Sequence, residues 1–130
     1  MGTVFTFYSY KGGVGRTMAL ANIAILLARK GLKVLAVDWD LEAPGLDLYF
    51  KSFGEPPGLN RGLIDLLEAK RSNPRTNPDW RGYLSSIDVQ GDHRLTLLLS
   101  GSSGRKYRSR VLGFDWPSFF KEKGGGDFIE

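Results

Sequence analysis

Residues 8–22 read YSYKGGVGRTMALAN, and this stretch decides the prediction of the fold. It resembles the phosphate-binding pattern G-x-x-x-x-G-K-[ST], with Tyr10 at the first glycine position and Arg16 at the lysine position. The three glycines of KGGVG allow a tight turn, and backbone N–H groups at the start of a helix can surround a phosphate. The sequence therefore predicts an anion-binding loop between a strand and a helix.

The residues on either side of the loop predict a βαβ unit. Thr3–Tyr8 is β-branched and aromatic and is predicted to be a buried strand, whereas Thr17–Lys30 has helical apolar spacing and a stop at Gly31. Lys33–Val37 is a second short apolar run. Two strands joined by a helix imply a parallel sheet. We therefore expect an α/β fold with a mostly parallel sheet, and the resemblance of residues 8–22 to a phosphate-binding loop implies the three-layer αβα arrangement of P-loop NTPases.

The rest of the chain is predicted to alternate between short elements and polar loops. Helical segments are expected over Leu59–Lys70, Trp80–Leu84 and Asp115–Lys123, and strands over Ser86–Val89 and Leu95–Leu99. Loops are expected over Leu41–Leu48, Arg71–Asp79 and Gly101–Arg110, the last of them flexible and basic. The three glycines 124–126 end the last helix, and the final DFIE looks like the start of another.

Composition narrows the classes of protein further. A chain of 130 residues is long enough for one domain with a modest core. The absence of cysteine excludes disulfides, thiolate metal sites and cysteine nucleophiles, and it fits a cytoplasmic location. The longest apolar stretch, Met18–Ala28, is too short to span a bilayer. The net charge of +4 favours anionic partners such as nucleotides or nucleic acid without selecting one.

KGGVGRT resembles the deviant Walker A motif, KGGxGK[ST], of the ParA/MinD family of P-loop ATPases. The resemblance implies that Lys11 reaches the nucleotide of a second subunit, that Arg16 takes the role of the phosphate-binding lysine and that Thr17 holds Mg²⁺. Arg16 keeps the charge but is planar and bulkier than lysine, so nucleotide binding is expected and hydrolysis is left open. The implied binding loop comprises Lys11, Gly12, Gly13, Val14, Gly15, Arg16, Thr17 and Met18.

A second motif, VDWDLEAPGLD, follows the Lys33–Val37 run. Carboxylates at the carboxyl end of a strand beside a phosphate loop can hold water or Mg²⁺. The family has [VI]D-x-D at this point, and the resemblance implies that Asp40 positions the attacking water while Asp38 belongs to the Mg²⁺ shell. Residues 38–48 would then be a segment of the switch I type, with Lys11 and Asp40 catalytic and Thr17, Asp38 and Asp40 near the metal. The alternative is that the two aspartates only cap a turn.

The resemblance implies an ATP-binding switch protein with ATP and Mg²⁺ as cofactors. Binding of ATP rather than ADP would control formation of a homodimer, which would regulate an attached domain or a partner such as DNA or another protein. The resemblance is strong over residues 1 to 50, but no later strand ending in aspartate and no base-recognition loop follow. We therefore expect residues 1–130 to be the N-terminal portion of such a domain, and whether this portion is itself an enzyme is left open.

The sequence also leaves three alternatives open. The chain could be a nucleotide sensor that binds without turnover because of Arg16. It could be a DNA-binding module that uses the basic segment Gly101–Arg110. It could also bind a dinucleotide, since Gly13-x-Gly15 precedes Asp38 by about 20 residues, but Met18 stands at the third glycine position.

Overall fold

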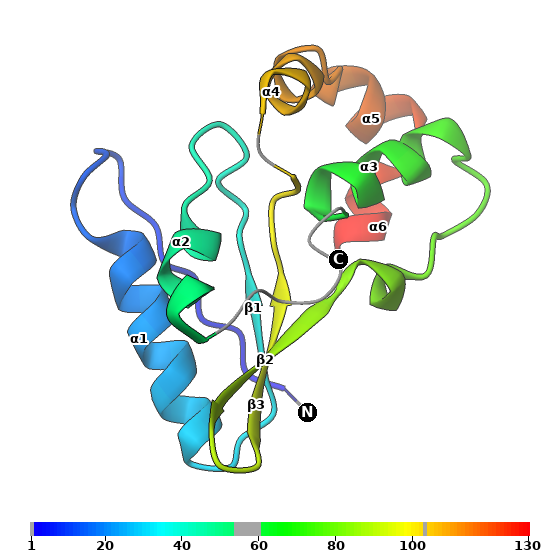
Figure 1. Ribbon diagram of the computed structural model, residues 1–130. Helices are drawn as coiled ribbons and strands as arrows, with labels where there is room; N and C mark the ends of the chain where they lie inside the picture. The colour runs from blue at the N-terminus through cyan, green and yellow to red at the C-terminus, as the bar shows by residue number, and fades with distance from the viewer. Residues whose placement is uncertain (1, 54–60, 103) are drawn as a thin grey trace.

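The computed structural model describes residues 2–53, 61–102 and 104–130. In this part of the chain, helices alternate with the strands of one small sheet (Figure 1). The elements are α1 (Arg16–Arg29), β1 (Val34–Val37), α2 (Leu46–Phe50), the 3-10 turn η1 (Lys51–Phe53), α3 (Leu63–Ser72), the 3-10 turn η2 (Trp80–Tyr83), β2 (Ser85–Gln90), β3 (His93–Leu98), α4 (Arg105–Leu112), α5 (Trp116–Glu122) and α6 (Gly125–Ile129).

The described strands form one mixed sheet in the order β1-β3-β2. β1 and β3 are parallel, with Val34 opposite Leu95 and Val37 opposite Leu98. β2 and β3 are antiparallel, and their tight connection includes Gly91 at φ +59°. The α/β class predicted from the sequence is confirmed in this coarse form. The mostly parallel three-layer arrangement stays a prediction, because only one of the two strand pairs is parallel.

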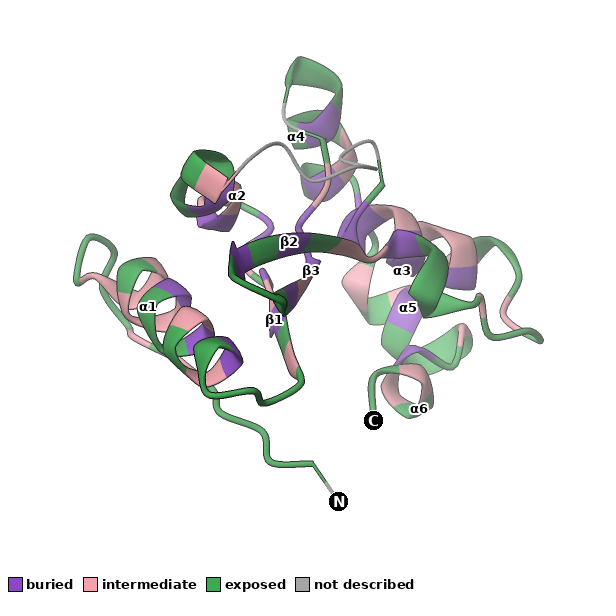
Figure 2. Cartoon of the chain, turned by 60° about the horizontal axis from the view of Figure 1, so that its bottom comes forward, coloured by how far each residue is buried: buried purple, intermediate pink, exposed green. Residues whose placement is uncertain are grey.

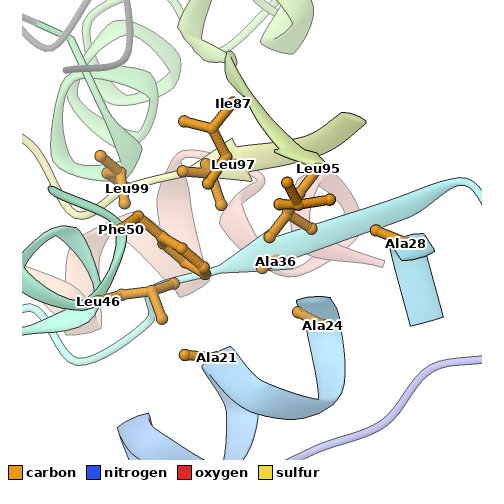
Figure 3. Close-up of a cluster of buried hydrophobic side chains, with 11 residues drawn as sticks. Ala21, Ala24, Ala28, Ala36, Leu46, Phe50, Ile87, Leu95, Leu97 and Leu99 are labelled. Carbon is orange, nitrogen blue, oxygen red and sulfur yellow. The ribbon is translucent and has the colours of Figure 1, made fainter. Parts of the chain in front are cut away.

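One hydrophobic core lies between α1, α2 and the sheet (Figure 3). The buried residues of α1 are all small, Ala21, Ala24 and Ala28, and the partly buried Leu20 and Ile25 pack beside them. Because alanine is short, the helix can lie close to Leu95 and Leu97 of β3. Leu46 and Phe50 of α2 complete this core. Close packing of α1 fixes the position of its N-terminus relative to the carboxyl end of β1.

A second core lies on the other side of the sheet, where α3 and the helices α4 to α6 gather (Figures 1 and 2). Its buried members include Ile64 and Leu67 of α3 and Phe119 of α5. The Phe119 ring meets that of Phe114 edge-on, with ring centroids 5.3 Å apart. This core joins the carboxyl-terminal third of the chain to the sheet through Leu98 of β3.

Most predicted elements are confirmed with small shifts at their ends. The predicted helix Thr17–Lys30 is α1, the strand Lys33–Val37 is β1, and the helix Asp115–Lys123 is α5. The helix predicted from Leu59 begins at Leu63, and residues 59 and 60 lie outside the described residues. No helix in the described ranges is both long and apolar enough to cross a membrane.

The prediction that Thr3–Tyr8 is a buried strand is wrong. The segment joins no described sheet, and Val4 and Tyr8 are 89% and 79% exposed. β-branched and aromatic residues favour a strand only where a pleated, half-buried surface is available to pack on. No neighbouring strand within the described residues supplies such a surface, so the composition alone does not produce pairing.

Two predicted loops contain helices. α2 begins at Leu46, inside the segment predicted as the loop Leu41–Leu48, because the Asp38 carboxylate accepts the N–H groups of Gly45 and Leu46 at its start. α4 occupies most of the segment predicted as the flexible basic loop Gly101–Arg110. There the buried pair Tyr107 and Val111, four residues apart, anchors one helical face to the second core.

Candidate phosphate-binding loop and the aspartate segment

The glycine-rich loop leads directly into α1, as predicted. Gly13 and Gly15 have φ of +73° and +81°, a left-handed conformation that side chains rarely adopt. Gly15 is the N-cap residue of α1 and has no side chain to occupy the first free N–H groups of the helix. The loop therefore needs glycine at these two positions for its backbone conformation, and the end of the helix stays open to an acceptor.

The residues around this helix end favour an anion. The first turn of α1 contains no acidic residue, and it begins with Arg16 and Thr17, both partly buried. Lys11, Val14 and Met18 are exposed around the loop. The partial positive charge of a helix N-terminus adds to that of Arg16 and Lys11. The predicted loop residues thus lie together around one helix end.

Arg16 contacts the aspartate segment that follows β1. Its guanidinium lies 3.3 Å from Oδ2 of Asp40, and both side chains are about one-third exposed, at 33% and 38%. The other carboxylate oxygen of Asp40 accepts the N–H of Ala43 at 3.2 Å. The structure therefore joins the two predicted motifs, at the arginine that replaces the usual lysine.

Asp38 points into its own loop. It is buried, and its carboxylate accepts backbone N–H groups from Asp40 at 3.2 Å, Gly45 at 3.3 Å and Leu46 at 3.1 Å. Burial raises the pKa of Asp38 above its ordinary value, and these three hydrogen bonds oppose that rise. Asp38 thus closes the 38–46 segment and fixes the place from which Asp40 projects.

Tyr107 is a residue of the site region that the sequence analysis did not identify. Its hydroxyl donates to the backbone oxygen of Leu41 at 2.8 Å, and both residues are buried. Burial raises the pKa of Tyr107. Arg110, one turn further along α4, binds Glu68 and Asp65 of α3, with shortest distances of 2.6 and 2.7 Å. The aspartate segment is therefore attached to α4, and α4 to α3.

Within the described residues, no group of three or more histidine, cysteine or acidic side chains could hold a metal ion by itself. Mg²⁺ takes oxygen ligands, usually keeps several waters and binds few protein ligands beside phosphates. The Thr17 hydroxyl lies in the first turn of α1, and Asp40 is joined to that turn through Arg16. The residues present fit a metal that arrives with phosphate.

Comparison with known proteins places the chain in a family. Residues 5–106 match the CobQ/CobB/MinD/ParA nucleotide binding domain, and the chain belongs to this family. The septum site-determining protein MinD of Helicobacter pylori is 40% identical over 74 residues, which cover 56% of this chain and 25% of that protein. The chromosome-partitioning ATPase Soj of Treponema pallidum is 36% identical over 98 residues, which cover 70% of this chain and 36% of that protein.

A third relative extends the match along the chain. The ATPase ASNA1 homolog 2 of Paramecium tetraurelia is 34% identical over 116 residues, 89% of this chain and 34% of that protein. The chain thus spans about a quarter to a third of the length of these curated relatives. No solved structure matches it. The family supports a nucleotide-binding domain and an ATP-binding function in general terms.

Proposed function

We propose that this chain is the N-terminal, phosphate-binding portion (residues 1–130) of an ATP-dependent switch protein of the MinD/ParA type, with a P-loop NTPase fold of three αβα layers. The observation that carries the proposal is the loop at the start of α1, where two left-handed glycines precede a helix end whose first turn has Arg16 and no carboxylate. Two of the relatives are named as ATPases, which supports ATP as the nucleotide.

Phosphate binding in this proposal rests on the backbone and on two cations. The N–H groups from Gly13 to Met18 donate to phosphate oxygens at the helix end. Arg16 turns from Asp40 to the phosphates, where its planar group can donate two parallel hydrogen bonds. Lys11, on the exposed side of the loop, serves the nucleotide of a second copy in a homodimer that forms with ATP. Val14 lines the rim of the same loop.

The same proposal gives Thr17 the role of a Mg²⁺ ligand and Asp40 the role of positioning the attacking water. Mg²⁺ bound with ATP would neutralise developing charge on the phosphates. Thr17 offers its hydroxyl to the ion, and Asp40, once Arg16 leaves it, can orient water toward the terminal phosphate. Asp38 would act through water in the outer shell, since three backbone N–H groups already occupy its carboxylate. Turnover to ADP and phosphate is proposed for the whole protein, and a sensor without turnover is the second candidate because Arg16 replaces lysine.

In this proposal, the protein acts in the cytoplasm, and ATP-dependent dimerisation changes which partner it binds. Arg105, Lys106 and Arg108 lie exposed on α4, and none of them forms an ion pair within the described part of the chain. Cations in the first turn of a helix are unfavourable for the helix itself. Their exposure there supports an anionic partner such as DNA, beside a protein partner.

The proposal is tested by titrating the purified chain with a fluorescent ATP analogue, with and without Mg²⁺. Wild-type protein is expected to bind saturably, and Gly15→Val to lose at least about tenfold in affinity, because the backbone at φ +81° and the close phosphate approach exclude a branched side chain. Gly31→Val is the matched control, since Gly31 has φ +83° at the far end of α1. Equal losses in both variants, or no binding by folded wild type, would refute the proposal.

A further inference from the structure

A cavity of about 370 Å³ lies beside Asp40, on the side of the aspartate segment that faces the last helices. Its walls come from the segment after β1 and from the α4–α5 region, and they are Trp39, Asp40, Leu41, Glu42, Val111, Leu112, Phe114 and Trp116. We call it the acidic aromatic cavity. Its volume is near the lower end of the range for ligand sites, roughly 300–1,000 Å³, so it suits one long side chain better than a nucleotide.

The lining has a distinct chemical character. It contains two carboxylates, those of Asp40 and Glu42, and none of the eight lining residues is basic. Trp39 is exposed and Trp116 is partly buried, and both contribute indole rings that can accept a cation. The same aromatic group already holds one guanidinium, because the Arg71 Cζ lies 5.0 Å from the centre of the Phe114 ring. A planar cation with an apolar stem matches these walls.

The charge of the cavity depends on Arg16. In the structure, Arg16 pairs with Asp40 across 3.3 Å, whereas Glu42 forms no ion pair with any residue that the structure describes. In the proposed function, phosphates compete for Arg16 and release Asp40. The cavity then carries two negative charges instead of one. Because coupling between two ligands is reciprocal, a cation in the cavity would also favour nucleotide binding at the loop.

We propose that the acidic aromatic cavity receives an arginine side chain of a partner protein, and that it does so more tightly when Arg16 leaves Asp40. The guanidinium lies against the indoles of Trp39 and Trp116 and pairs with Glu42 and Asp40, while its stem contacts Leu112. The coupling to nucleotide rests on the proposed function, but the site itself does not. The nucleotide's phosphates attract Arg16 and the partner's arginine attracts Asp40, so both ligands favour separation of the Arg16–Asp40 ion pair.

The test is an NMR titration of the full chain with N-acetyl-arginine amide, with N-acetyl-citrulline amide as its uncharged isostere. The indole N–H signals of Trp39 and Trp116 are expected to shift with the arginine probe, whereas Trp80, which lies outside the cavity, is the internal control. Glu42→Gln should weaken binding of the probe about 1.5- to 5-fold and leave nucleotide binding unchanged. Equal shifts with citrulline, or shifts of all three indoles alike, would overturn the site.

A second experiment tests the coupling between the Arg16–Asp40 ion pair and the cavity, and it does not need nucleotide. Arg16→Gln frees Asp40 and should tighten probe binding about 1.5- to 5-fold, the range for a partly exposed ion pair. Mg²⁺ with a non-hydrolysable ATP analogue should tighten the wild type to a similar extent. If Arg16→Gln is folded, as judged by indole signals dispersed as in the wild type, and does not bind the probe more tightly, the coupling is overturned. Tightening in Arg16→Gln but no nucleotide binding by the wild type would reject the proposed function and keep the arginine site.

Discussion

Lys70 is a buried lysine that has no carboxylate partner among the described residues, so its contribution to stability can be predicted from its hydrogen bonds. It ends the buried face of α3 and is 5% exposed. Its ammonium donates to the backbone oxygen of Pro74 and to Oδ1 of Asn77, both at 2.8 Å, and more weakly to the oxygen of Thr76 at 3.4 Å. The ammonium therefore organises the loop that joins α3 to η2. We expect Lys70→Met, which keeps the stem but removes the charge, to destabilise the protein.

The magnitude follows from two opposing terms. Two well-formed hydrogen bonds from a charged donor contribute about 3–6 kcal/mol together. Against this stands the cost of burying an ammonium, several kcal/mol, which Met does not incur. We expect a net loss of about 1–3 kcal/mol in the free energy of unfolding. For a chain of 130 residues this corresponds to a fall in Tm of about 4 °C per kcal/mol, or roughly 4–12 °C.

The assay is thermal and urea unfolding followed by far-UV circular dichroism. Lys121→Met is the control, because Lys121 is exposed on α5 and the same change there should leave Tm within about 2 °C. A Lys70→Met protein as stable as the wild type, or more stable, would show that the desolvation cost outweighs the hydrogen bonds. In that case the account of the 73–77 loop as a structure held by one ammonium would be wrong.

Two further predictions use the same assays. Gly125→Ala should lower the free energy of unfolding by about 1–3 kcal/mol, because a Cβ there would overlap the Phe119 ring, whereas Gly126→Ala on the same helix has open space and should be nearly neutral. Burial raises the pKa of Tyr107 above 10.0, so its stabilising effect is complete below pH 10 and is lost as the pH rises through the folded-state value. Unfolding free energy should thus fall more steeply above pH 10 in the wild type than in Tyr107→Phe; parallel curves would contradict this.

The sequence predicts an element correctly where its local pattern agrees with the packing of that element in the fold. The helical spacing of α1 and the glycines before it predict the loop and the helix within one residue. The composition of Thr3–Tyr8 predicts a strand, and the structure does not pair it, because pairing depends on a neighbour that composition does not encode. The basic, serine-rich character of the segment around Tyr107 hides a helix that only the second core stabilises.

The candidate site was predictable as a set of residues but not as a set of contacts. The motifs predict that Arg16 and Asp40 both serve the nucleotide, and the structure adds that they contact each other. The inward direction of Asp38 depends on where Gly45 and Leu46 present their N–H groups, which is a property of the folded loop. Tyr107 reaches Leu41 across 66 positions of sequence, a distance over which no local pattern carries information.

The position of β1 at one end of the sheet has a consequence for handling the protein. Within the described chain its only strand partner is β3, so the backbone groups along its outer side have no ladder to join. A free strand edge can pair with a strand of another molecule. The exposed side chains of Val4 and Phe5 add apolar surface that can also take part in association. The colloidal behaviour of the purified chain, including its tendency to precipitate on concentration, is therefore expected to depend on this edge more than on its net charge.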